Sequence, residues 1–433
     1  MNLIKTTFKE LKYFLILWST QALSQLGSSM TNYALIVWSY TAKGSALTTA
    51  LLSVCSYAPY VIMSVFAGSL SDKWNKKITM LVSDTFAALC TISIFVLLKT
   101  DRLEIWHLYC LNALNGLMNT VQQPASDVAI TLLTPKKHYQ KVSGLRSFSN
   151  ALISILTPII ATAVLSFANL QTIIYIDLLT FVIAFISLTF FVKIPEYKAD
   201  KNTDSFLTLT KSRLTYLKQN RGILDLILFL ALILFLACIN LIASIYNAAF
   251  PAMILSKENG GEIALGTVNA FIGVATLIGS IVASLMPMPK SRVKVICNTL
   301  LISMSTENFF LALGKTLPLW CIGGILGWLC IPIMSANMDV LFRERIPVSM
   351  QGRVYAARNT FQFFTIPLGY ILGGYLVDKV FEPFMAKNNN ATLSVLFGTG
   401  KGSGTAFLFL FLAFAGIAIC LVFRKDKNIW KLE

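Results

Sequence analysis

Residues 68–77, GSLSDKWNKK, form a short polar connection between two long apolar segments. The segments, at about 46–71 and 78–98, are each long enough to cross a bilayer, which takes about 20 helical residues. So short a connection forces a tight hairpin at the membrane surface. Its lysines need no role beyond anchoring the hairpin on the cytoplasmic side. Asp72 suggests more, because an acid there can bond the N-terminus of a neighbouring helix, and Gly68 lets helices approach closely.

The composition is that of an integral membrane protein. The chain has 433 residues, of which 56% are hydrophobic and 13% charged, and its mean hydropathy is +0.69. A soluble domain carries about 25% charged residues. Twelve apolar segments recur, at about 13–40, 46–71, 78–98, 105–133, 142–167, 170–194, 222–254, 262–287, 293–313, 317–341, 350–380 and 404–423. The sequence therefore predicts an all-α integral membrane protein with twelve transmembrane helices and no additional soluble domain.

The longest polar interruption divides the predicted helices into two sets of six. We expect an N-terminal half at 1–194, a cytoplasmic linker with an amphipathic helix at 195–221, and a C-terminal half at 222–433. A weak internal repeat supports two pseudo-symmetric halves. Three residues of the first half recur 208 positions later in the second: Pro124, Leu133 and Gly144 as Pro332, Leu341 and Gly352.

The basic residues predict the orientation of the chain. Of the 36 lysines and arginines, 28 fall in the two tails and in the connections on the same side as the tails, and 8 fall on the other side. This bias places both termini in the cytoplasm. The net charge of +16 therefore has a membrane explanation, and nothing favours nucleic acid as a partner.

The 68–77 connection resembles the signature loop between helices 2 and 3 of the major facilitator superfamily. Matching residues are Gly68, Asp72, Lys73, Lys76 and Lys77, whereas Asn75 stands where that family usually has glycine. Residues 16–40, 122–135, 351–374 and 377–383 look like the macrolide-efflux-like branch of bacterial drug:proton antiporters.

The resemblance implies a function. It predicts a secondary active transporter in the bacterial plasma membrane, acting as a monomer, that exports an amphipathic or hydrophobic small molecule by alternating access in exchange for protons. In that superfamily a loop acid, a loop base and an acid at the end of helix 4 form a gating triad, which Asp72, Lys76 and Asp127 match. The antiporter motif of helix 5 keeps Pro158 but replaces its glycines by small residues. Pro367, Gly373 and Gly374 are expected to bend helix 11.

Polar residues on helices 1, 4, 7 and 10 are candidates for the substrate cavity, because these helices line the cavity in the family. Such residues are costly inside a membrane. They also have a simpler explanation as interhelical hydrogen bonds that hold the bundle together. Together they suit a bulky, mostly apolar molecule. The candidates are Gln25, Asn32, Asn112, Asn115, Asn119, Asn240, Tyr246, Asn247, Trp328 and Asn337.

Three acids inside predicted helices are candidates for carrying the coupling proton: Asp177, Glu307 and Asp84. A carrier must change charge at accessible pH, which the amides of the cavity cannot do. None of the three lies on a cavity helix in the family's arrangement. The alternative is that they are structural partners of arginines or helix N-termini.

No cofactor, metal or catalytic activity is expected. The eight cysteines all lie in predicted helices without close pairs, and there are two histidines. Gly314, Lys315 and Thr316 look like the end of a phosphate-binding loop, but Phe309 occupies the place of its first glycine. Two further functions remain open: export of an endogenous product such as a siderophore, or facilitated diffusion as a uniporter. A third, of another class, is a lipid-handling or sensor protein without solute flux.

Overall fold

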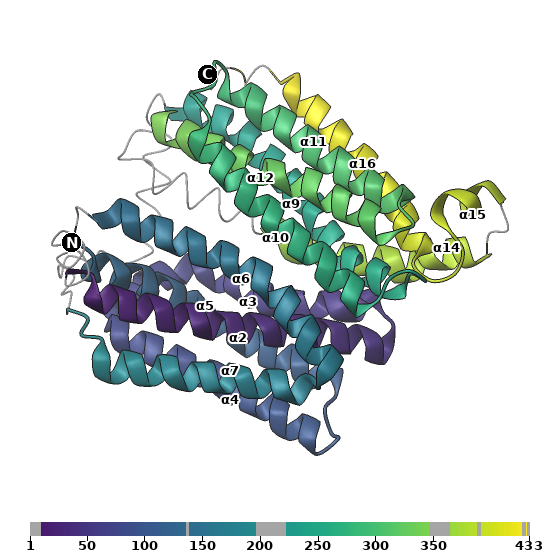
Figure 1. Cartoon of the computed structure of the whole chain (residues 1–433). Coiled ribbons are helices and arrows are strands. Elements are labelled where there is room, and N and C mark those ends of the chain that lie inside the picture. Colours follow the sequence, from purple (N-terminus) through teal and green to yellow (C-terminus); the bar gives the residue numbers. More distant parts are fainter. Residues whose placement is uncertain are drawn as a thin grey trace. The chain divides into compact units, whose positions relative to one another are not determined.

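The computed structural model describes residues 10–135, 138–195, 222–345, 364–387, 391–426 and 430, and at 60, 64–73, 140, 141, 143, 222–231 and 342–345 it describes the helical backbone alone. These ranges contain helices and no strand. The α-helices, labelled in Figure 1, are α2 (Lys12–Lys43), α3 (Ala46–Lys73), α4 (Lys76–Lys99), α5 (Ile105–Leu133), α6 (Tyr139–Phe167), α7 (Leu170–Ile186), α9 (Gly222–Ser256), α10 (Glu262–Leu285), α11 (Arg292–Leu313), α12 (Leu317–Arg345), α14 (Glu382–Lys387), α15 (Ala391–Phe397) and α16 (Ser403–Arg424). Two π-helices are η2 (Ser187–Phe191), which follows α7, and η3 (Leu376–Phe381), which precedes α14. Residues 364–375 are also helical and continue into η3.

Within the described ranges, nine helices are long and apolar enough to cross a membrane. The helices α2 and α5, with 32 and 29 residues, are also long enough but are not among the nine. They carry the polar residues that the sequence assigns to a cavity, such as Gln25 and Asn112, and these lower their hydropathy. Polarity, and not length, therefore separates α2 and α5 from the nine apolar helices.

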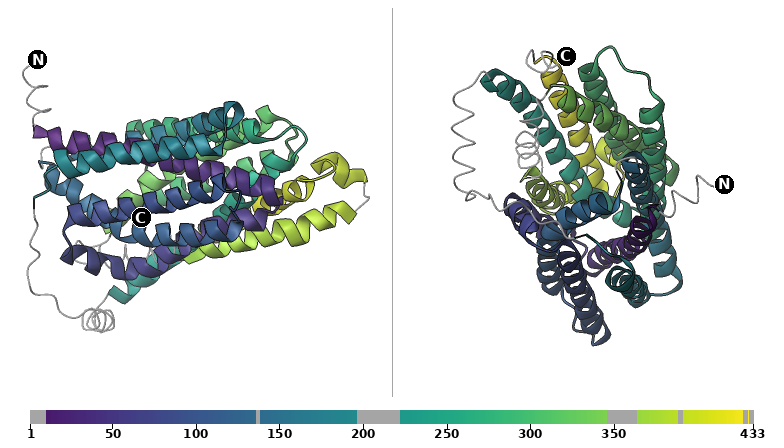
Figure 2. Two further views of the ribbon diagram at one scale, coloured as in Figure 1. Left: turned by 90° about the horizontal axis from the view of Figure 1, so that it is seen from below. Right: turned by 90° about the vertical axis from the view of Figure 1, so that its left-hand side faces the viewer.

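The chain forms two compact units. Unit 1 consists of Met1–Ser39 and Cys55–Thr203, and unit 2 of Tyr40–Val54 and Asp204–Glu433. Within each unit the long helices run side by side (Figure 2). Since α3 begins at Ala46 and ends at Lys73, its first turns belong to unit 2 and the remainder to unit 1.

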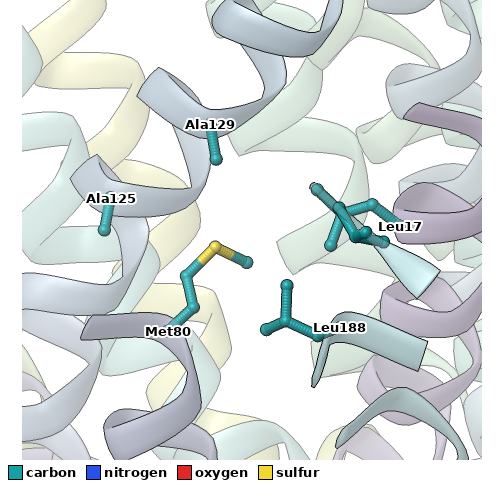
Figure 3. Packing of buried hydrophobic residues seen from close by; sticks show 6 residues of the cluster. Leu17, Met80, Ala125, Ala129 and Leu188 are labelled. Carbon is teal, nitrogen blue, oxygen red and sulfur yellow. The ribbon is translucent and has the colours of Figure 1, made fainter. Parts of the chain in front are cut away.

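The core of unit 1 brings together α2, α4, α5 and the end of α7 with η2. Because lipid is as apolar as leucine, such helices associate by close packing, which small residues allow. Two alanines on α5 contribute no bulk and let Met80 and Leu188 meet (Figure 3). The buried cluster consists of Leu17, Met80, Ala125, Ala129, Leu188 and Val192.

The connection between α3 and α4 shows why asparagine replaces the expected glycine. Only Trp74 and Asn75 separate the two helices. Asn75 is the N-cap of α4, and its side-chain oxygen accepts hydrogen bonds from the backbone N–H groups of Lys77 and Ile78 at 3.0 and 3.2 Å. Its φ of −65° requires no glycine. The substitution therefore strengthens the start of α4.

In unit 2, α11 packs against α12 and α16, α10 packs against α12, and α16 packs against α9. The short helices α14 and α15 precede α16. The Nζ atoms of Lys257 and Lys315 donate to the carbonyls of Phe397 and Val395, both 2.5 Å away, and so bind the last turn of α15. Burial lowers the pKa of the Lys257 amine from its ordinary value, and the nearby charge of Glu382 opposes that shift.

Candidate functional site

Glu307 lies on α11 in unit 2 and is 5% exposed. Its Oε1 accepts hydrogen bonds from the Tyr246 hydroxyl at 2.5 Å and from the Trp328 indole Nε1 at 2.9 Å. Tyr246 belongs to α9 and Trp328 to α12. One buried carboxyl oxygen thus connects three helices through two neutral donors.

The surroundings of this carboxyl group are aromatic and tightly packed. The Tyr246 ring stacks on Phe250 with centroids 5.4 Å apart and meets the edge of Phe409 at 5.5 Å. On the α12 side, a Cβ atom at Gly327 would overlap the side chain of Glu307. Gly327 therefore makes room for the acid, and the neighbouring Trp328 bonds it.

Asp84 on α4 is an acid of unit 1. Gln21 on α2 donates to its Oδ2 at 3.1 Å, and Gln122 on α5 donates to its Oδ1. Asp84 is half-buried. Two flexible side-chain amides surround this acid, where two aromatic rings surround Glu307.

Asp177 on α7 is the second acid of unit 1 and is 4% exposed. Ser28 on α2 donates to its Oδ1 at 2.9 Å. A Cβ atom at Gly27 would meet the Thr180 hydroxyl and the Asp177 backbone, so α2 and α7 are in close contact here.

The three acids share one arrangement that was not predicted. Each accepts a hydrogen bond from α2, α5, α9 or α12, which correspond to the predicted helices 1, 4, 7 and 10. In the part of the chain that the structure describes, no ion pair includes Asp84, Asp177 or Glu307. Buried carboxylates without a cationic partner are costly unless they are neutralised. Hydrogen bonds therefore join the three acids to the helices that carry the candidate cavity residues, so a change in the charge of an acid would alter those bonds.

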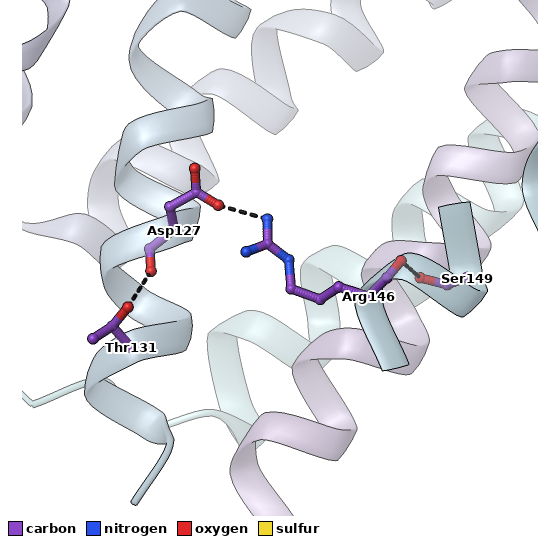
Figure 4. A network of polar contacts seen from close by, with 4 residues as sticks. All are labelled: Asp127, Thr131, Arg146 and Ser149. Carbon is purple, nitrogen blue, oxygen red and sulfur yellow. Dashed lines mark hydrogen bonds and ion pairs between the residues drawn. The ribbon is translucent and has the colours of Figure 1, made fainter. Parts of the chain in front are cut away.

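Asp127 forms an ion pair within unit 1. Its Oδ1 lies 2.6 Å from Nη2 of Arg146, and the two side chains are 48% and 37% exposed (Figure 4). The Arg146 carbonyl accepts from Ser149, whose hydroxyl oxygen also accepts from Trp18 Nε1 at 3.2 Å. The predicted pairing of Asp127 with Lys76 stays a prediction. The side chain of Lys76 is buried, and its Nζ donates to the Trp74 carbonyl at 3.2 Å.

Of the remaining residues of the signature loop, the structure describes the side-chain contacts of Lys77 alone. Lys77 Nζ donates to the carbonyls of Thr189 and Val192, each at 2.9 Å, and so caps the end of η2. The structure describes only the helical backbone at Gly68, Asp72 and Lys73, without their surroundings. Residues 346–363, at the start of predicted helix 11, lie outside the described residues. The predicted contact of Asp72 with that helix therefore stays a prediction.

The candidate cavity residues differ in exposure. Tyr246 and Trp328 bond Glu307, and buried Asn337 donates to the Ile333 carbonyl of its own helix. Three asparagines are half-buried, Asn112, Asn115 and Asn240, and four amides are exposed, Gln25, Asn32, Asn119 and Asn247.

The expected bending residues lie inside helices. Pro158 is within α6, and Pro367 is within the helical residues 364–375. A Cβ atom at Gly373 would overlap Ala248 and Ile245 of α9, and one at Gly374 would overlap the backbone of Leu47. These glycines serve close helix contacts in unit 2.

The fold is that of an α-helical membrane protein. The sequence model of the Major Facilitator Superfamily matches residues 17–288, and the chain belongs to this family. It is a multi-pass protein of the bacterial plasma membrane.

Among curated proteins, the chain is 24% identical over 376 residues to macrolide efflux protein A of Streptococcus pyogenes, covering 86% of this chain and 90% of that protein. It is 24% identical to macrolide efflux protein A of Enterococcus faecalis, covering 75% and 99%. Two solved structures share the fold at a TM-score of 0.70: a mutant of the nucleoside transporter NupG, 15% identical with 96% and 99% covered, and an inward-facing bacterial homologue of the iron transporter ferroportin, 14% identical with 96% and 98% covered.

Proposed function

We propose that this protein exports an amphipathic or hydrophobic small molecule, of drug or macrolide type, by alternating access in exchange for protons. The similarity to two macrolide efflux proteins supports the direction of transport and the substrate class. The observation that carries proton exchange is Glu307, a buried carboxyl group bonded by two neutral donors and by no cation in the described residues.

Glu307 is the first candidate for the coupling proton. It is connected to α9 and α12, the two helices of unit 2 that supply all the predicted cavity residues there. Because Trp328 only donates hydrogen bonds, it stays on a carboxyl oxygen in both charge states, whereas the Tyr246 hydroxyl can either donate or accept. Proton binding at Glu307 would thereby reverse its hydrogen bond with Tyr246 of α9. Asp177 and Asp84 remain further candidates in unit 1.

The proposed architecture has twelve transmembrane helices with both termini in the cytoplasm, acting as a monomer. The described spans, together with α2, α5 and the predicted helix 11, make up the twelve. Asp72, Lys76 and Asp127 are proposed to gate the cytoplasmic side, supported by the match to the signature loop. The exposed and half-buried amides of α2, α5 and α9 are proposed to contact the substrate.

Transport by the purified protein in proteoliposomes tests this function. A macrolide and a fluorescent lipophilic dye would be followed with and without an imposed pH gradient, and protein-free liposomes would be the control. We expect accumulation that needs the gradient and is abolished by a protonophore, together with proton release when substrate is added. Flux that ignores the gradient would identify a uniporter. Lipid movement without solute flux would identify a protein of another class.

A further inference from the structure

Asp378 accepts three hydrogen bonds from a part of unit 2 that is distant in the sequence. It lies in η3, and its Oδ2 accepts from the Ser45 hydroxyl at 2.6 Å and from the Leu47 N–H at 2.9 Å. Its Oδ1 accepts from the Ala46 N–H at 3.0 Å. More than 330 residues of sequence separate the donors from this acid.

These bonds complete the N-terminus of α3. The first N–H groups of a helix have no partner within the helix. Ser45 Oγ accepts from the Thr48 N–H at 3.1 Å, and Asp378 takes the N–H groups of Ala46 and Leu47. A carboxylate also interacts favourably with the positive end of the helix. The start of α3 is therefore finished by a residue of η3.

Packing reinforces the contact. Ala46 is fully buried, and Gly374, four residues before Asp378, lies against the Leu47 backbone where a Cβ atom would not fit. Gly44, with a φ of +62°, makes the sharp turn from α2 into α3 that a residue with a side chain would strain. Together these features form a corner, residues 44–47, seated on the helix that carries Asp378.

The corner matters because of where α3 leads. Its first turns belong to unit 2, whereas Cys55 to Lys73 belong to unit 1. Transporters of this type work by movement of one bundle relative to the other. We therefore expect such movement to strain the hydrogen bonds that hold the start of α3 on unit 2.

We propose that Asp378 is a gating residue, which holds residues 45–47 on unit 2 in one state of the transport cycle and releases them in the other. The sequence predicts that this corner lies on the external side, at the opposite end of α3 from Asp72. The α3 helix would then be gated at both ends by aspartates. This inference rests on the proposed function, because release is needed only in a protein that alternates.

Glu382 provides a matched control four residues further along. Its Oε1 accepts from the Thr405 N–H at 2.8 Å and from the Thr405 hydroxyl at 2.6 Å, and its Oε2 accepts from the Gly402 N–H at 3.2 Å. It thus caps α16 as Asp378 caps α3. Both Glu382 and α16 lie in the same continuous part of unit 2, so this cap is expected to stay closed throughout the cycle.

The first experiment cross-links each cap. Ser45→Cys with Asp378→Cys, and Glu382→Cys with Thr405→Cys, would be joined by a short bifunctional thiol reagent, and dye transport measured before and after reduction. The treated wild type controls for its native cysteines. We expect the first cross-link to stop transport reversibly and the second to leave the rate unchanged. Full transport by the protein cross-linked at 45 and 378 would overturn the proposal.

The second experiment needs no transport. Ala50→Cys places a thiol at a site that is 1% exposed near the start of α3. Its rate of modification by a small thiol reagent reports release of the corner. Adding Asp378→Asn should raise that rate about fivefold, which corresponds to about 1 kcal/mol, whereas Glu382→Gln should not. An unchanged rate with Asp378→Asn would disprove release at this contact even if the protein transports nothing.

Discussion

Asp84 in unit 1 and Glu307 in unit 2 face the same physical problem with different partners. Each is an intramembrane acid bonded by two neutral side chains from two other helices. Glutamine amides can turn and present either a donor or an acceptor, so both partners of Asp84 can follow a change in its charge. Around Glu307, the indole N–H only donates, and Tyr246 is the partner able to reverse its bond.

The comparison shows where a proton would have a directed effect. At Asp84, protonation can be absorbed by rotation of Gln21 or Gln122 with little movement of the helices. At Glu307, packed rings restrict the response to Tyr246 and hence to α9. We therefore expect the two units to respond unequally to neutralisation of their acids.

The largest effect is expected from Glu307→Gln. Accumulation driven by a pH gradient should fall about tenfold or more, while downhill exchange persists, because the substituted amide still fills the site but carries no exchangeable charge. Asp177→Asn and Asp84→Asn should retain more of the driven accumulation. The exposed Glu258→Gln is the control. Equal losses for all three intramembrane acids would remove the distinction between the units.

Replacing either of two glycines that make room for acids by alanine should have an intermediate effect, which we expect on the stability of the fold. Gly327→Ala would press on the Glu307 side chain, and Gly27→Ala on the α7 backbone beside Asp177. Each should lower the free energy of unfolding by about 1–3 kcal/mol, with the larger loss at Gly327, because its added Cβ would overlap the Glu307 side chain as far back as the Cβ, whereas the closest overlap at Gly27 is with the Thr180 hydroxyl. Thermal unfolding in detergent measures this. Gly144→Ala, with no atom within 4 Å of its added Cβ, is the control and should not destabilise.

The smallest change in stability is expected at the ion pair of unit 1. Asp127→Asn should cost about 0–1 kcal/mol, since both side chains are more than one-third exposed. If Asp127 takes part in gating, its transport rate should nevertheless fall clearly below that of Arg146→Lys. Similar transport by both variants and the wild type would restrict the pair to a minor structural role.

The helices could be predicted from the sequence because bilayer thickness fixes the length of an apolar segment. The segment predicted at 262–287, for example, is α10 at Glu262–Leu285. Asp177 and Glu307 were identifiable because a charge inside an apolar helix is costly. Their partners were not, since helical spacing gives the face of a residue but not its neighbour on a distant helix. Tyr246 and Trp328 were accordingly predicted as cavity residues, without their bonds to Glu307.

Other functional residues carried too little signal. Gln21 was one of several polar residues on the first helix, and nothing in the sequence connects it with Asp84, 63 positions away. Gly327 looks like any small residue in a membrane helix. Asp378 follows an apolar segment where acids are common, and its role emerges only when α3 and η3 are brought together.

The π-helix η3 has a consequence for how relatives should align. Its hydrogen bonds join residues five apart rather than four, so the turn accommodates one more residue than an α-helix. Losing one residue between 376 and 381 would restore α-helical spacing, while the residues beyond the turn would keep their faces. Asp378, inside the turn, would then lose its place against α3, whereas Glu382, just beyond it, would keep its cap on α16. We expect relatives that lack the acid at 378 but keep the acid at 382 to be one residue shorter here.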